Sequence, residues 1–130
     1  MISKHSLLPQ YTDDDDAELH IRASKILIHM GIPPCSKGYE YLRRAIIETY
    51  HSPDATEYIT KSLYPRVARI CRASSVTGIG RSCQRAIECA YQNSDVRKYF
   101  GGDKPPSCAQ FISAVANHLH RSVEKNAQAR

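Results

Sequence analysis

Four polar residues recur at the spacing of one exposed α-helix face. Positions i, i+3, i+4 and i+7 of this face hold Arg81, Gln84, Arg85 and Glu88. A guanidinium group matches the O6 and N7 acceptors of guanine, and a Gln amide can form two hydrogen bonds with adenine. We therefore predict that the face reads base edges in duplex DNA through Arg81, Gln84 and Arg85. The alternative interpretation is an ordinary solvated face in which Arg85 pairs with Glu88.

The chain around this face carries only positive charge. No carboxylate occurs between Glu57 and Glu88, although the chain as a whole holds 13 acidic and 18 basic residues and a net charge of +5. One sign of charge over such a length attracts polyanions, although basic surfaces are also common in soluble proteins. We expect this window to contact the DNA backbone through Lys61, Arg66, Arg69, Arg72 and the hydroxyl of Thr77.

The remaining reactive residue types do not form a catalytic or metal-binding pattern. The five cysteines contain no C-x-x-C pair, and His118 and His120 would lie about 200° apart on a helix. The run Asp13–Asp16 lacks the spacing and the glycine of a calcium loop. We expect reduced thiols, no metal, no cofactor and no enzymatic activity.

Length and composition favour one globular domain. The chain has 130 residues, of which 42% are hydrophobic and 24% charged. No apolar run approaches the roughly 18 residues that span a bilayer, and the first residues lack the apolar core of a secretory signal. We expect a cytoplasmic protein without membrane contact, divided into a flexible acidic leader at 1–16 and a folded domain at 17–130.

Apolar periodicity predicts an all-α domain of about six helices. Sustained alternation with a period of two is absent, and helical spacing recurs at 17–30, 37–51, 54–62, 65–72, 78–92 and 107–125. Local signals mark the ends: Gly31 follows the first helix, Ser36 and Ser107 are candidate N-caps, and Pro65 suits a first helical turn. A long loop is predicted at residues 93–106.

Each predicted helix has an apolar stripe that should face the core. We expect the helix at 54–62 to pack Tyr58 and Ile59, and the helix at 65–72 to bury Val67, Ala68, Ile70 and Cys71. The inward residues of the helix at 78–92 should be Ile79, Cys83, Ala86, Ile87, Ala90 and Tyr91. The tyrosines could instead stack on nucleic-acid bases, but their helical spacing favours packing between helices.

The fourth and fifth predicted helices have the spacing of a helix-turn-helix. About five residues separate 65–72 from 78–92. In this motif the second helix enters the major groove while the first crosses the backbone. The polar face at Arg81–Glu88 belongs to the second helix, so 78–92 is the predicted recognition helix, with Thr77 as its N-cap.

Four ordered segments resemble the C-terminal effector domain of the stage-zero sporulation master regulator, a response regulator of spore-forming Firmicutes. The matching strings are KGYEYLRRAI at 37–46, ITKSLYP at 59–65, Arg81 with RAIE at 85–88, and the Phe111-Ile112 pair with the Pro and Ser before it. Together they cover roughly residues 20–123.

The resemblance implies a six-helix DNA-binding domain that regulates transcription. Members bind tandem promoter boxes as head-to-tail dimers and contact the RNA polymerase sigma subunit. Arg81 matches the arginine that reads a guanine, Arg85 a basic residue near the backbone, and Thr77 a hydroxyl at the helix start.

The sequence also departs from the family pattern. Gly80 stands where the family has a base-contacting glutamate, and Gly78 and Gln84 stand where it has arginines. The segment before residue 17 does not match the family's phosphoacceptor receiver, so we expect a constitutive or partner-dependent binder. Two functions follow: a sequence-preferring DNA-binding transcription regulator, or a protein-interaction module of the same fold that modulates a related regulator.

Overall fold

The computed structural model describes residues 13–93, 97, 100 and 104–129. Within these residues all regular structure is helical, which confirms the predicted all-α fold. Five α-helices and two short turns follow one another: α2 (Asp13–His29), α3 (Lys37–His51), the 3₁₀ turn η1 (Ala55–Tyr58), the π turn η2 (Ile59–Leu63), α4 (Tyr64–Cys71), α5 (Val76–Asn93) and α7 (Cys108–Ala129). Residues 1–12 of the predicted leader, and most of the predicted loop at 93–106, lie outside the described residues.

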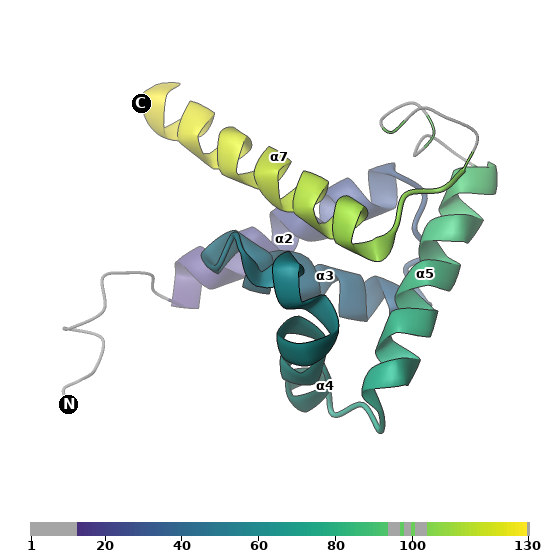
Figure 1. Ribbon diagram of the computed structural model, residues 1–130. Helices are drawn as coiled ribbons and strands as arrows, with labels where there is room; N and C mark the ends of the chain where they lie inside the picture. The colour runs from purple at the N-terminus through teal and green to yellow at the C-terminus, as the bar shows by residue number, and fades with distance from the viewer. Residues whose placement is uncertain (1–12, 94–96, 98–99, 101–103, 130) are drawn as a thin grey trace, which may run out of the picture.

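The helix α3 is the centre of the fold. It contacts α2, α4, α5 and α7, and Figure 1 shows it between the long C-terminal helix α7 above and α4 below, with α5 along one side. Its bounds agree with the predicted 37–51, and the Ser36 hydroxyl caps it by accepting from the Tyr39 amide at 3.2 Å. An apolar stripe that faces several neighbours at once explains why seven of its residues are buried.

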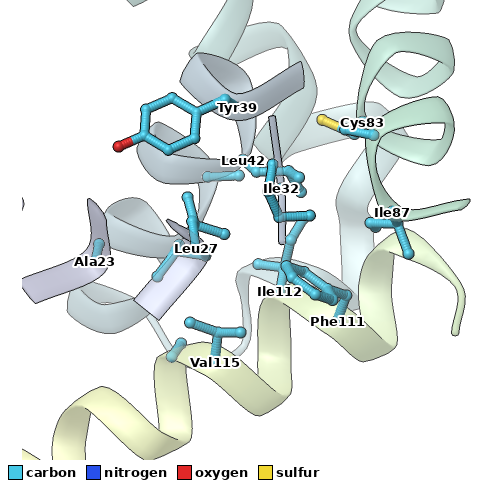
Figure 2. Packing of buried hydrophobic residues seen from close by; sticks show 14 of the residues in the cluster. Ala23, Leu27, Ile32, Tyr39, Leu42, Cys83, Ile87, Phe111, Ile112 and Val115 are labelled. Carbon is cyan, nitrogen blue, oxygen red and sulfur yellow. The ribbon is translucent and has the colours of Figure 1, made fainter. Parts of the chain in front are cut away.

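The core forms where stripes of α2, α3, α5 and α7 meet. Leu27 of α2, Leu42 of α3, Ile87 of α5 and Ile112 of α7 are fully buried and lie close together in Figure 2. The predicted inward residues of α5 are all buried: Ile79, Cys83, Ala86, Ile87, Ala90 and Tyr91. Burial of this stripe leaves the opposite side of α5 toward solvent.

The starts of α2 and α7 compare differently with the predictions. The first helix begins at Asp13, four residues before the predicted start. The predicted cap at Ser107 is confirmed: its hydroxyl accepts from the Gln110 amide at 3.2 Å, and the Gln110 side-chain oxygen accepts from the Ser107 amide at 3.0 Å.

Two predicted details before α5 are wrong. Residues 55–63 form η1 and η2 instead of one α-helix, and neither turn has a side-chain cap; the Tyr58 side chain is 61% exposed. Within α4, Val67 is buried and Ala68 and Cys71 are partly buried, whereas Ile70 is 43% exposed. Only a narrow face of the short helix α4 packs against the core, and Ile70 is not on that face.

A glycine permits the close crossing of α3 and α5. A β-carbon at Gly38 would collide with the backbone carbonyl oxygen of Ser82 and would lie 2.7 Å from the β-carbon of Ala86. The carbonyl oxygen belongs to the backbone of α5, so it cannot move without displacing that helix. The absence of a side chain at Gly38 therefore sets the distance between the two helices.

We expect Gly38→Ala to lower the free energy of unfolding by about 2–3 kcal/mol, because the added methyl group forces α5 away from α3. Urea unfolding followed by circular dichroism measures this change. Lys37→Ala is the matched control, since the exposed neighbour should change stability by less than about 0.5 kcal/mol. Equal stability of the two variants would contradict the tight crossing.

Candidate nucleic-acid interface

The helices α4 and α5 form a helix-turn-helix with a four-residue connection at 72–75. Arg72 ends α4 in the left-handed conformation (φ 58°), and the Ala73 amide donates to the Ala68 carbonyl at 2.9 Å. Figure 1 shows the two helices joined by this tight connection at one end of the molecule. The connection places α5 directly beside α4, and the two helices are in contact.

The cap of α5 differs from the predicted one. The helix begins at Val76, and the Gly78 amide donates to the hydroxyl of Ser75 at 3.0 Å, so Ser75 supplies the N-terminal cap. Thr77 therefore lies inside the first turn, where its side chain is exposed. The prediction of Thr77 as N-cap is wrong, because the helix extends two residues further toward its N-terminus than the sequence pattern indicated.

The exposed side of α5 carries the two predicted arginines. Arg81 and Arg85 lie one turn apart, and both are exposed. Among the described residues neither guanidinium lies within 4.0 Å of a carboxylate, so the alternative pairing of Arg85 with Glu88 does not form. Both groups are thus available to an external acceptor.

Gln84 is held inside a hydrogen-bond chain instead of standing free beside the arginines. Its Nε2 donates to Glu88 Oε2 at 3.4 Å, and its Oε1 accepts from the Cys108 thiol at 3.3 Å. The side chain is half-buried. These two bonds fix the orientation of the amide and use one of its two N–H donors and one of its two acceptor lone pairs.

The Cys108 thiol joins three helices, and sequence reasoning did not identify it. It lies at the first residue of α7, contacts the Gly80 carbonyl of α5 at 3.9 Å, and forms a side-chain hydrogen bond with Tyr64 of α4. Burial raises the pKa of this thiol above its usual value, although the bond with Tyr64 acts in the opposite direction. The protonated thiol can therefore donate at neutral pH. No local sequence signal distinguishes this cysteine from the other four.

The flanking cations fall into two groups. Lys61, Arg69 and Arg72 are exposed. Arg66 is different, because its Nη1 lies 3.3 Å from Oε1 of Glu48, whose other carboxylate oxygen lies 3.5 Å from Arg44. This pairing ties α4 to α3 and reduces the charge that Arg66 presents to a polyanion.

Gly80 has a packing role at the contact between α4 and α5. A β-carbon there would lie 3.2 Å from Cε2 of Tyr64, which is tighter than most such contacts. Burial raises the pKa of the Tyr64 hydroxyl far above its usual value, so the group remains a neutral hydrogen-bonding partner. The glycine thus lets the buried ring of Tyr64 approach α5.

Other kinds of site find little support in the described part of the chain. There, no three His, Cys, Asp or Glu side chains gather closely enough to hold a metal ion. Across the same residues, none of the helices combines the length and apolar character needed to cross a bilayer.

Comparison with known families agrees with this geometry. The sequence model of the family described as Sporulation initiation factor Spo0A C terminal matches residues 23–119, well over half of the chain. The match runs from α2 into α7 and includes the whole helix-turn-helix. The chain therefore belongs to the family of the C-terminal domain of sporulation initiation factor Spo0A, a DNA-binding regulatory domain.

Proposed function

We propose that this protein is a sequence-preferring regulator of transcription that places α5 in the major groove of duplex DNA. The observation that carries this proposal is the exposed, carboxylate-free pair Arg81 and Arg85 on the second helix of a helix-turn-helix. A helix with its side chains is about 10–12 Å across, which fits a major groove about 12 Å wide. The 18 residues of α5 extend about 27 Å, enough to cross the groove.

In this arrangement some of the charged groups contact bases and others contact the DNA backbone. Arg81 and Arg85 reach base edges, and the exposed cations Lys61, Arg69 and Arg72 contact phosphates together with the Thr77 hydroxyl. Arg66 also belongs to the backbone-contacting set, but its ion pair with Glu48 makes it a weaker contact than Arg69. Backbone contacts supply affinity that is independent of sequence, and the base contacts add preference.

Gln84 is the most constrained of the three proposed base-contacting side chains. Since its amide is oriented by Glu88 and Cys108, it reads adenine through its second N–H and its second lone pair, or after exchanging those partners for the base. The family has an arginine at this position and a glutamate at Gly80, so the preferred DNA box should differ from the family's box. By the same resemblance, two copies would occupy tandem boxes and the polymerase sigma subunit would be a protein partner.

The other candidate function is an interaction module that modulates a related regulator without reading DNA. The hydrogen bonds that link Cys108, Gln84 and Glu88 favour this second function. They engage a side chain that would otherwise face a base, and the Glu88 carboxylate is exposed on the same helix. A gel shift on genomic fragments over a salt series distinguishes the two functions. Salt-sensitive binding supports the regulator, and absence of binding at low salt supports the module.

We expect Arg81→Ala to weaken binding to the preferred duplex by about 1–3 kcal/mol and to relax selection at one base pair, because a base contact is lost. The preferred duplex is first selected from random sequences on the purified protein, and affinities are then measured by fluorescence anisotropy. Arg69→Ala is the matched comparison: it removes an exposed guanidinium from α4 and should weaken all duplexes alike. Equal losses on preferred and scrambled DNA for Arg81→Ala would contradict base reading.

Arg72→Gly should separate stability from DNA binding. Glycine adopts the left-handed conformation of this residue without the cost of about 1 kcal/mol that a side chain incurs, so the variant should unfold at a urea concentration equal to or above that of the parent. The same change removes a phosphate contact and should weaken all duplexes. Arg72→Ala keeps the strain and loses the same cation, so it should bind equally weakly but be less stable than Arg72→Gly. Unchanged DNA affinity in both variants would exclude Arg72 from the interface.

A further inference from the structure

A cavity of about 350 Å³ lies between α2 and α7. Its apolar lining includes Ile26 and Met30 of α2, Val115 of α7, and Phe100, whose ring stacks on Phe111 with centroids 5.7 Å apart. Met30 and Val115 are buried, whereas Ile26 and Phe100 are half-buried. The volume and the mostly apolar lining are those of small-molecule sites, which typically begin at about 300 Å³.

Basic side chains surround this apolar lining. Lys25 and His29 come from α2, and His118 and Arg121 come from α7; all four are exposed and line the cavity. Among the described lining residues none carries a carboxylate. Two permanent charges and two imidazoles therefore converge on one apolar hollow, an arrangement that favours an anionic head group next to a hydrophobic body.

The cavity is separate from the candidate DNA interface. None of the lining residues that the structure describes belongs to α4 or α5. The lysine and arginine at its edge are therefore not among the cations that flank α5. A function of this cavity would be additional to DNA binding and would not depend on it.

We propose that this cavity binds a small amphipathic carboxylate, with the apolar chain against Met30 and Val115 and the carboxylate between Lys25 and Arg121. Arg121 is suited to hold the head group through two parallel hydrogen bonds, and Lys25 adds a point charge from the facing helix. The site takes the ionised carboxylate of a medium-length chain in preference to an alcohol or a cation of equal length.

The test uses decanoate as the probe, with 1-decanol and decyltrimethylammonium as analogues that keep the ten-carbon chain and change the head. Titrations of the ¹⁵N-labelled full chain are followed by amide chemical shifts. Decanoate should bind with a Kd on the order of 100 µM and shift amides of α2 and α7 around the cavity. Decanol should bind at least about tenfold more weakly, and the cationic analogue should not bind at this site.

Two pairs of variants locate the site. Ala114→Phe places a ring into the cavity from an exposed lining position and should abolish decanoate binding, whereas Asn117→Phe, exposed on the same helix outside the lining, should not change it. Arg121→Gln should weaken decanoate at least about fivefold without affecting decanol, and Lys37→Gln should affect neither. Each of three results would overturn the proposal. These are equal affinity for the three ten-carbon ligands, amide chemical-shift changes spread over the whole chain, and unchanged decanoate binding by Ala114→Phe.

Discussion

The orientation of the candidate DNA-reading helix depends on the close crossing of α3 and α5 at Gly38. Because this glycine meets the backbone of α5 at Ser82, the two helix axes approach more closely than any side chain would allow. The crossing also fixes the rotation of α5 about its own axis, since Cys83 and Ala86 must face α3 and the core. Arg81 and Arg85 are exposed as a consequence. The surface that we propose to meet DNA is thus positioned by packing on its opposite side.

The last helix contributes to the same surface through one thiol. Cys108 begins α7 and bonds to Gln84, while Tyr64 of α4 bonds to Cys108, so both helices of the helix-turn-helix are connected to α7 at one point. The central helix α3 supports α2 and α7 as well, and between these two lies the basic-edged cavity. The fold therefore presents two separate surfaces of positive charge: the exposed side of the helix-turn-helix, which we propose to face DNA, and the edge of the apolar cavity.

Much of the architecture was predictable because it follows from neighbouring residues. Periodicity predicted the bounds of α3 and the whole inward stripe of α5, and the Ser36 and Ser107 caps followed from the residue types that bond to helix amides. Predictions failed where local signals compete. Ser75 and Thr77 are both suitable caps, and only Ser75 accepts a bond; Ile70 fits an apolar stripe that the short helix α4 does not bury.

Periodicity, capping chemistry and the sign of the charge are properties of short stretches, so they determined the all-helical class, the helix-turn-helix and its basic character. The availability of each polar side chain depended on residues distant in the chain. Arg66 is paired with Glu48, 18 positions away, and Gln84 is held by Cys108, 24 positions away. Position 80 receives the ring of Tyr64, a contact that likewise exists only once α4 and α5 are packed. Tertiary packing alone decided these partnerships, because hydrogen bonds and ion pairs require groups to meet within a few ångströms and helical spacing says nothing about which helices become neighbours.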